Sequence, residues 1–269
     1  MDFSLSCFTL GNSNCSFKMS EMEKFFKFVF GAVIMLIVLL GLFLAYSTMV
    51  DYKPEPIESI SVSKGNVVSV YDTINVFNWN IGYCGLGDDM SFFYDGGDKV
   101  RTSKERTLEN IKQIKKQLVK HDSVDFYLLQ EVDRKSRRSY KTNQPDTIQR
   151  ALPNYHSSFA VNYKVAFVPK PFSNPMGSVD GGLMSLSKHE AFSVNRHAFP
   201  GNYDWPVGLF FLDRCFMVQR FYTSNGKELL IINTHNSAYD DGTLRTQQMK
   251  LLRGFLIEEY KKGNYILGQ

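Results

Sequence analysis

A long run without a charged side chain, from Phe28 to Val50, restricts the fold of this chain more than any other feature. About 20 consecutive apolar residues are enough for a helix to cross the hydrocarbon core of a bilayer. A buried core helix would carry a polar stripe, which this run lacks, and a cleavable signal peptide has a shorter apolar run. The run therefore predicts one uncleaved transmembrane helix over residues 28–50, in contact with the lipid bilayer.

The positive charges beside this run predict its orientation. Three lysines precede the run and two follow it: Lys18, Lys24, Lys27, Lys53 and Lys64. Because positive side chains favour the inner face of a membrane, this distribution predicts that the amino terminus is inside. We expect a single-pass membrane protein whose main domain lies on the extracytoplasmic face.

The remainder of the chain divides by composition. Residues 1–27 form a polar tail, and residues 51–58, with two prolines among charged residues, indicate a linker. Residues 59–269 contain no internal repeat, and a hydrophobic content of 43% is enough for a sizeable core. We expect one domain there. The net charge of +4 neither requires nor excludes nucleic acid as a partner.

Strand-like and helix-like patterns alternate in this domain. A helix is expected to open with the capping box Thr102-x-x-Glu105 and to bury Leu108, Ile111, Ile114 and Leu118. A second helix, capped by Asp241, is expected to bury Leu244, Leu251, Leu252, Phe255 and Leu256. The expected strands cover residues 74–81, 124–132, 159–168, 182–197, 216–223, 228–234 and 264–267.

Asn225-Gly226 lies between two of these strands and is the pair that a tight hairpin turn prefers. Hairpins mixed with strand–helix units favour an α+β fold with two stacked mixed β-sheets flanked by helices, rather than a doubly wound parallel sheet. Cys84 and Cys215 follow the apolar run, and their separation gives no reason to pair them.

Three polar residues stand at the ends of apolar strands: Asn80, Glu131 and His235. Such residues tend to converge on one rim of a sheet, where ligand sites often lie. Burying Glu131 costs several kcal/mol unless a cation or hydrogen bonds compensate. A carboxylate with an amide and water suits Mg²⁺, and a neighbouring His can donate to a phosphoryl oxygen or transfer a proton.

Each of these residues also has an ordinary structural interpretation. A single Glu at a strand end is more often the partner of a salt bridge, and a single His is more often a satisfied structural side chain. Asn80 alone could be a turn former. Only their occurrence together favours a functional site.

Four segments around these residues resemble the endonuclease/exonuclease/phosphatase superfamily, which includes deoxyribonuclease I, exonuclease III, bacterial sphingomyelinases and inositol polyphosphate phosphatases. They are residues 77–82 (FNWNIG), 129–133 (LQEVD), 182–188 (GLMSLSK) and 231–235 (IINTH). The resemblance extends from Ile74 to Gln269. It implies the deoxyribonuclease I-like four-layer sandwich.

The resemblance also implies roles for individual residues. Glu131 is similar to the family's metal-binding Glu, and Asn80 to the amide beside the metal and the scissile phosphate. His235 is similar to the first of two active-site histidines, which contacts the phosphate. The chain would then be a metal-dependent phosphoester hydrolase, favouring phosphodiesters, in which water attacks phosphorus with the help of Mg²⁺, or alternatively Mn²⁺.

The substrate is left open between nucleic acid, a phospholipid and a small phosphoester, and no obligate protein partner is inferred. Asn233, Tyr83 and Arg101 are the candidates for substrate binding. The loop at residues 82–97, rich in Gly and aromatic residues, either forms a lid or wall beside the phosphate or is a packed surface loop. Lys135, Arg137 and Arg138 could bind an acidic substrate or form a solvated face.

The chain departs from the family pattern after Gly268. The family continues with Gly-Asp-x-Asn and later an Asp-His pair, whereas this sequence ends at Gln269. We expect an incomplete domain from a truncated gene model or a fragment, with turnover belonging to a longer form. One alternative is a catalytically inactive module that keeps the fold and binds phosphoesters or a partner. Another is a membrane-tethered structural domain whose motif matches are accidental.

Overall fold

The computed structural model describes residues 21–121, 123–237 and 241–268. It divides into two compact units, Met1–Tyr46 and Ser47–Gln269. The predicted polar tail lies outside the described residues as far as residue 20.

The apolar run forms the helix α1, Glu21–Met49, which begins before the predicted start at Phe28. Glu21 and Glu23 lie in its first turn, where a carboxylate interacts favourably with the helix dipole. Its most apolar 18-residue window has a mean hydropathy of 3.0, and no part of that window is buried. By length and composition α1 can cross a membrane, although an amino-terminal signal sequence meets the same criteria.

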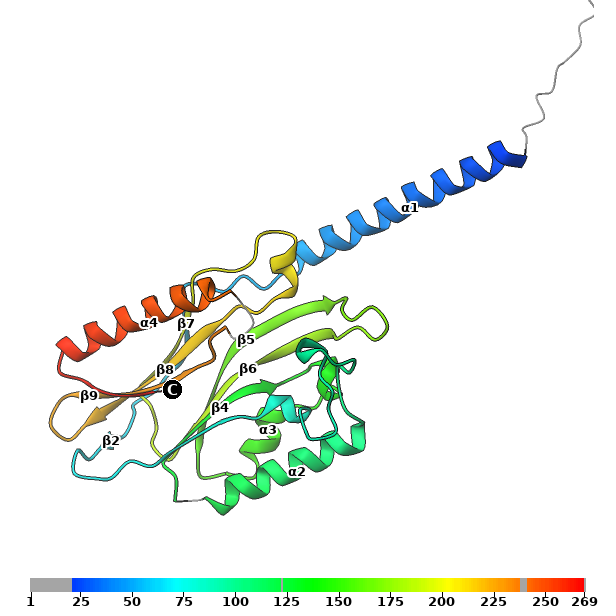
Figure 1. Cartoon of the computed structure of the whole chain (residues 1–269). Helices are drawn as coiled ribbons and strands as arrows, with labels where there is room; N and C mark the ends of the chain where they lie inside the picture. Colours follow the sequence, from blue (N-terminus) through cyan, green and yellow to red (C-terminus); the bar gives the residue numbers. More distant parts are fainter. Residues whose placement is uncertain (1–20, 122, 238–240, 269) are drawn as a thin grey trace, which may run out of the picture. The chain divides into compact units, whose positions relative to one another are not determined.

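The second unit contains two mixed β-sheets (Figure 1). The first sheet has the order β1 (Ile57–Val62), β7 (Ser193–Ala198), β8 (Cys215–Thr223), β9 (Glu228–Thr234), β10 (Tyr265–Gly268), and β2 (Val67–Val68) pairs with β8. The second sheet has the order β3 (Val76–Asn80), β4 (Phe126–Asp133), β6 (Gly177–Ser187), β5 (His156–Val168). The pairs β2–β8, β9–β10 and β3–β4 are parallel and the others are antiparallel.

Helices cover the outer faces of both sheets (Figure 1). On β4, Tyr127 and Leu129 pack with α2 (Lys104–Lys120) and α3 (Gln144–Gln149), whereas Phe126 and Leu128 belong to the core between the sheets. Beyond the first sheet, Leu252 of α4 (Thr243–Lys261) packs on Phe216, Val218, Leu230 and Ile232. These layers confirm the predicted α+β fold with two stacked mixed sheets and flanking helices.

Several local predictions were wrong. The N-cap of α2 is Ser103, whose side chain accepts a hydrogen bond from the Arg106 amide, because the Thr102 hydroxyl is already bound to Asp89. Leu108 and Leu251 are 49% and 42% exposed, since each helix buries a narrower stripe than expected.

Other differences concern short or divided elements. The stretch 182–197 belongs to two strands, β6 and β7, in different sheets. Strand β1 begins inside the predicted linker, and neither β2 nor α3 was predicted. Asp241 precedes the N-cap of α4 but still accepts a hydrogen bond from the Thr243 amide at 3.0 Å. Cys84 and Cys215 are both buried and free.

Candidate functional site

Polar side chains continue the apolar inner faces of the two sheets. Because side chains alternate across a strand, Asn233 and His235 extend the face on which Leu229 and Ile231 meet the core between the sheets. Gln130 donates to Oδ1 of Asn233 at 2.7 Å and to Oδ1 of Asn78 at 2.8 Å, which links the two sheets. The polar residues at the strand ends are therefore brought to one region.

Glu131 is aimed by a β-bulge. Leu129 pairs with Met184 and Val132 with Gly182, so two residues of β4 stand opposite the single residue Leu183. Glu131 has φ +54°, a conformation that side chains other than glycine rarely adopt. Because of the extra residue, the Val132 side chain still packs on the face of the sheet that the helices cover. The Glu131 side chain does not follow the alternation of side chains along the strand.

Asn80, Glu131 and His235 meet at one carboxylate oxygen. Asn80 Nδ2 donates to Glu131 Oε1 at 3.0 Å, and His235 Nε2 lies 3.7 Å from the same oxygen, too far for a hydrogen bond. The Gly82 amide donates to Asn80 Oδ1 at 2.9 Å and fixes the orientation of the side-chain amide. The structure thus brings together the three residues predicted from separate strand ends.

These three side chains line a cavity of about 240 Å³. Its wall also contains aromatic, glycine and arginine residues, among them Phe92, Tyr94, Arg138, Tyr163, Gly181, Gly182, Tyr203, Phe211 and Arg214. Phe92 and Tyr94 belong to the loop predicted to be a wall or a packed surface loop, and they lie on the wall. The cavity is concave and largely apolar with a few polar groups, which is typical of a small-molecule site.

His235 is electrostatically biased towards its neutral form. Burial, reinforced by Arg214 and Arg138 and opposed by Glu131, lowers the pKa of His235 to about 4. Its backbone carbonyl accepts a hydrogen bond from Arg214 Nη1 at 2.9 Å. Nδ1 is buried and has no hydrogen-bond partner in the described part of the chain. We therefore assign the imidazole proton to Nε2, the nitrogen nearer Glu131.

The donor set around Glu131 fits a hard divalent cation. The Glu131 side chain is 22% exposed, and Mg²⁺ binds through one or two carboxylates while keeping several waters. Among the described residues no three His, Cys, Asp or Glu side chains cluster as a metal site. Asn80 turns its amino group to Glu131, so in this structure it orients the carboxylate rather than offering its oxygen.

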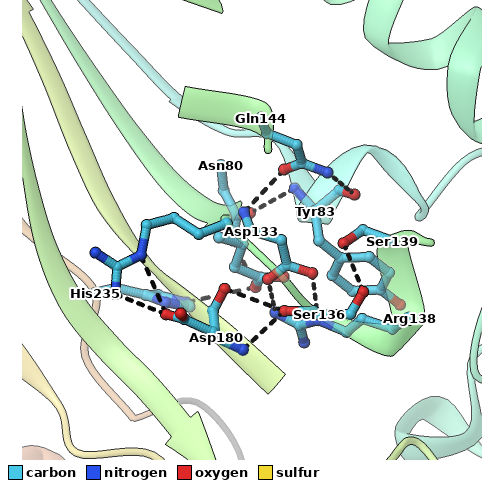
Figure 2. A network of polar contacts seen from close by, with 12 residues as sticks. Asn80, Tyr83, Asp133, Ser136, Arg138, Ser139, Gln144, Asp180 and His235 are labelled. Atoms are coloured by element: carbon cyan, nitrogen blue, oxygen red, sulfur yellow. Dashed lines mark hydrogen bonds and ion pairs between the residues drawn. The ribbon is translucent and has the colours of Figure 1, made fainter. Parts of the chain in front are cut away.

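Arg138 forms a buried ion pair beside the cavity (Figure 2). Its Nε and Nη2 donate to the two carboxylate oxygens of Asp133 at 3.0 and 2.9 Å, and its guanidinium lies 4.1 Å from the Tyr83 ring centroid. Burial opposes the charge, but Asp133 and Glu131 raise the pKa of Arg138 above its ordinary range. The sequence left Arg138 as either a substrate contact or part of a solvated face; it is 7% exposed and lines the cavity.

Tyr83, a predicted substrate contact, does not line the cavity but packs against Arg138, which does. Its side chain is fully buried, and Gln144 joins the Tyr83 carbonyl to the Asp133 amide with hydrogen bonds of 2.7 and 2.9 Å (Figure 2). Tyr83 and Cys84 have φ of 42° and 56°, so the chain after Asn80 turns sharply. This burial leaves no face of Tyr83 for a substrate.

Asn233 and Arg101 are likewise placed away from the cavity wall. Asn233 is fully buried and donates to the Leu129 and Met184 carbonyls at 3.2 and 3.1 Å. Arg101 donates to the Arg137 carbonyl at 3.0 Å and lies 4.3 Å from the Tyr140 ring centroid. The structure therefore does not support substrate contacts by these two residues.

The sequence missed the segment that supplies Gly201, Tyr203, Phe211 and Arg214 to the wall. No strand or helix pattern marks this segment. Its density of aromatic residues between two expected strands is the signal that could have identified it.

No protein-family model and no curated protein matches this chain. Solved structures of the endonuclease/exonuclease/phosphatase fold do match. An endonuclease/exonuclease/phosphatase from Beutenbergia cavernae has 19% identity and a TM-score of 0.46, over 68% of this chain and 43% of that chain. The human Nocturnin catalytic domain has 16% identity and a TM-score of 0.46, over 76% and 66%.

A mannosyl-6-phosphatase from Bacteroides thetaiotaomicron has 15% identity and a TM-score of 0.44, over 73% of this chain and 64% of that chain. This chain thus spans less than two thirds of the length of each of these three structures. Their fold is that of the superfamily which the sequence motifs resemble. Identities and TM-scores at this level assign no activity to this chain.

Proposed function

We propose that this chain carries the site of a metal-dependent phosphoester hydrolase of the endonuclease/exonuclease/phosphatase superfamily, with a preference for phosphodiesters. One observation supports this most strongly. Asn80 and His235, predicted from two different strands, approach the same carboxylate oxygen of Glu131 at 3.0 and 3.7 Å inside one cavity.

Each of the three residues has a role in the proposed reaction. Glu131 would hold Mg²⁺ or Mn²⁺ together with water, and Asn80 keeps the carboxylate in position. A bound cation would supply charge stabilisation at the phosphoryl oxygens and a lowered pKa for water. His235 donates a hydrogen bond from Nε2 to a phosphoryl oxygen, where negative charge develops as the oxygen of water bonds to phosphorus. The bond from phosphorus to the leaving oxygen breaks, and the proton that water gives up reaches that oxygen through solvent.

Arg138 and Arg214 make the cavity suitable for an anion. Both line it, and Asp133 holds Arg138 in a fixed orientation through two hydrogen bonds. Guanidinium groups bind phosphate oxygens with well-defined geometry. We assign Arg138 to phosphate binding in the ground state, which makes it a determinant of substrate affinity.

Substitution of Glu131 and His235 tests the reaction. In a form of the protein that hydrolyses bis(p-nitrophenyl) phosphate with Mg²⁺, we expect Glu131→Gln and His235→Ala to lower that hydrolysis by at least about 100-fold, because each removes a group at the reacting centre. Glu105→Gln and His156→Ala, which change exposed residues outside the cavity, are the matched controls. Full activity of either site variant would disprove the assignment.

Metal binding has its own measurement, independent of turnover. A cation that binds only the folded state raises the melting temperature of the protein by mass action. We expect Mg²⁺ to raise the melting temperature of the wild type and of Glu105→Gln but not of Glu131→Gln. Equal shifts in all three proteins would place the metal elsewhere.

A phosphoester-binding module without turnover is the second candidate. It is favoured by Arg138 and Arg214 in the cavity wall, which suit the binding of an anion whether or not turnover follows. It predicts saturable, Mg²⁺-dependent binding of inorganic phosphate by calorimetry together with no hydrolysis by the wild type. Binding that disappears in Glu131→Gln would assign it to the same cavity.

We also propose that α1 anchors the chain as a single-pass membrane protein, with the site on the extracytoplasmic face. The length and hydropathy of α1 support the anchor, and the lysine distribution supports the orientation. Resistance to carbonate extraction and protease protection of vesicles containing the full chain test the two statements separately.

A further inference from the structure

The segment Pro200–Leu212 exposes an unusual set of apolar side chains. Trp205, Val207 and Tyr203 are 64%, 47% and 38% exposed, and Asp204 is the single charged residue in the segment. Contiguous exposed apolar residues mark sites that contact another molecule or a membrane. Here the set lies on a connection between β7 and β8 that includes the short helix η4, Val207–Phe210.

A hydrogen bond places Trp205 beside the end of the apolar helix. Trp205 Nε1 donates to Thr48 Oγ1 at 3.1 Å, and both residues belong to the compact unit Ser47–Gln269. Thr48 lies in the last turn of α1, which ends at Met49. Met49 and Val50 are themselves 85% and 46% exposed.

Chain connectivity then fixes the depth of Trp205 relative to a membrane. If residues up to Val50 complete a membrane span, Thr48 lies near the level where hydrocarbon gives way to headgroups. A side chain within hydrogen-bonding distance of Thr48 lies at that level too. Trp and Tyr are the residues that favour this interfacial layer, because the ring is apolar and the N–H or O–H is polar.

The same segment forms part of the wall of the candidate site. The rings of Tyr203 and Phe211 lie 4.2 Å apart between centroids, and both line the cavity that contains Glu131 and His235. Trp205 itself is not among the cavity-lining residues. One short segment therefore joins the end of the apolar helix to the cavity.

We propose that the segment Tyr203–Val207, here named the interfacial loop, inserts into the headgroup layer of the bilayer and holds the cavity at the membrane surface, where its substrate is the phosphoester of a lipid headgroup. This inference rests on the proposed membrane anchor and on the proposed hydrolase site. It selects a lipid phosphoester over nucleic acid and soluble phosphoesters. Val207 and Trp205 contact the acyl boundary, and the carboxylate of Asp204 stays in the aqueous headgroup region.

Tryptophan fluorescence of the full chain in phosphatidylcholine vesicles tests the insertion. The chain has two tryptophans, so Trp79→Phe leaves Trp205 as the only reporter. We expect blue-shifted emission, and roughly twofold quenching by lipids brominated near the headgroup end of the acyl chain, as for an interfacial indole. Emission typical of water with no quenching would overturn the proposal.

A matched reporter at another exposed position controls for general contact with vesicles. Tyr71 is 93% exposed and lies between β2 and β3. In the triple variant Trp79→Phe, Trp205→Phe, Tyr71→Trp, the new reporter is expected to show no quenching. Equal quenching of both reporters would indicate non-specific adsorption and would also overturn the proposal.

Activity distinguishes the substrate class from the hydrolase assignment. We expect Trp205→Asp to lower hydrolysis of a phospholipid in the same vesicles by about 10-fold or more, because a carboxylate is unfavourable in the interface, while hydrolysis of soluble bis(p-nitrophenyl) phosphate stays unchanged. Trp205→Phe should retain most of the lipid activity. Equal losses on both substrates would make Trp205 a structural residue and overturn the proposal.

The failure of the two proposals can be told apart. If the wild type hydrolyses neither substrate, the hydrolase assignment and the lipid substrate both fail, while the quenching result still decides whether the loop inserts. If the wild type hydrolyses the soluble ester but no phospholipid, the hydrolase assignment stands and the lipid substrate is rejected.

Discussion

Glu131 combines the chemical role proposed for it with a backbone conformation that suits glycine better. Its φ of +54° follows from the bulge that turns its carboxylate towards Asn80 and His235. Non-glycine residues in this region cost about 1–2 kcal/mol. The bulge that directs the carboxylate into the cavity therefore lowers the stability of the folded chain at this position.

This strain predicts an unusual order of stabilities. We expect Glu131→Gly to unfold with a free energy about 1 kcal/mol higher than Glu131→Ala, since both lack the carboxylate and only glycine relieves the strain. At Lys164, an exposed position on β5 with ordinary backbone, the Gly variant should be the less stable of the two. Urea unfolding measures the stability of the Gly and Ala variants at both positions. If the same variant were the more stable one at Glu131 and at Lys164, the result would contradict backbone strain at Glu131.

A second prediction at the residue scale concerns pH. His197 stacks on Phe216 with 4.7 Å between ring centroids. Burial, reinforced by Arg220 and opposed by Glu259, lowers its pKa from 6.5 to about 4. A depressed His pKa gives stability that is present above the unfolded value of 6.5 and is lost as pH falls towards 4.

His197→Phe should remove this contribution. The free energy of unfolding of the wild type relative to the variant is expected to fall by about 1–2 kcal/mol over that pH range, less than the full shift would give, because solvent screens the partly exposed ring. The difference between the two proteins must be measured, because burial raises the pKa of Asp213 to about 7 and acts in the opposite direction over the same range. A difference that does not vary with pH would rule out a half-buried His197 that is held neutral.

At this scale the sequence predicted which residues meet but not every direction in which they face. Asn80, Glu131 and His235 were found because polar residues at the ends of apolar strands are visible in a sequence. Asn233 stands two residues before His235 on the same face of the strand. Its side chain lies deeper between the two sheets, and its amide group donates hydrogen bonds to carbonyls of the other sheet. Depth along a face is set by the partner sheet, which a single sequence does not reveal.

At the scale of elements, α2 shows how one neighbouring contact moves a helix start. Thr102 and Ser103 are both good N-caps by residue type, and Glu105 favours Thr102 as the start of a capping box. The Thr102 hydroxyl is bound to Asp89, so Ser103 takes the cap. A contact with a residue thirteen positions away decided between them.

Loss of the observed cap should destabilise the domain. We expect Ser103→Ala to lower the free energy of unfolding by about 1 kcal/mol, and Ser103→Asp to retain most of it, because Asp also accepts from the helix amides. Denaturant unfolding at fixed pH is the measurement. An unchanged free energy of unfolding in Ser103→Ala would indicate that Thr102, and not Ser103, caps α2.

Elements were predicted well where the pattern is long and apolar, and poorly where it is short. Strand β4 is buried on both faces and was found as a continuous apolar run. Strand β2 has two residues, and β1 is an edge strand with an exposed, mixed pattern. Such strands are formed by pairing with β7 and β8 rather than by a hydrophobic period of their own.

At the scale of the whole molecule, a buried amide cluster joins the two sheets. Asn233 donates to the Leu129 and Met184 carbonyls of the second sheet, and Gln130 donates to Asn233 and to Asn78. Buried amides fully paired in this way set the alignment of two sheets that apolar contacts alone would leave less specific.

Breaking the cluster should weaken the whole domain. We expect Asn233→Leu to lower the free energy of unfolding by about 3 kcal/mol, because buried carbonyls and the Gln130 amide lose their partner. Gln117→Leu, at an exposed position on α2, should change it by less than about 0.5 kcal/mol. Similar values for the two variants would show that water or other groups replace the lost bonds.

The bulge at Glu131 has an evolutionary consequence. Side chains before it alternate regularly as far as Gln130, and Val132 and Asp133 resume the same alternation after it. Deleting the single codon for Glu131 would therefore leave an uninterrupted strand with every other residue on its original face. The carboxylate of this site can be gained or lost in one genetic step while the scaffold is inherited unchanged, so active and inactive descendants of such a chain can share one fold.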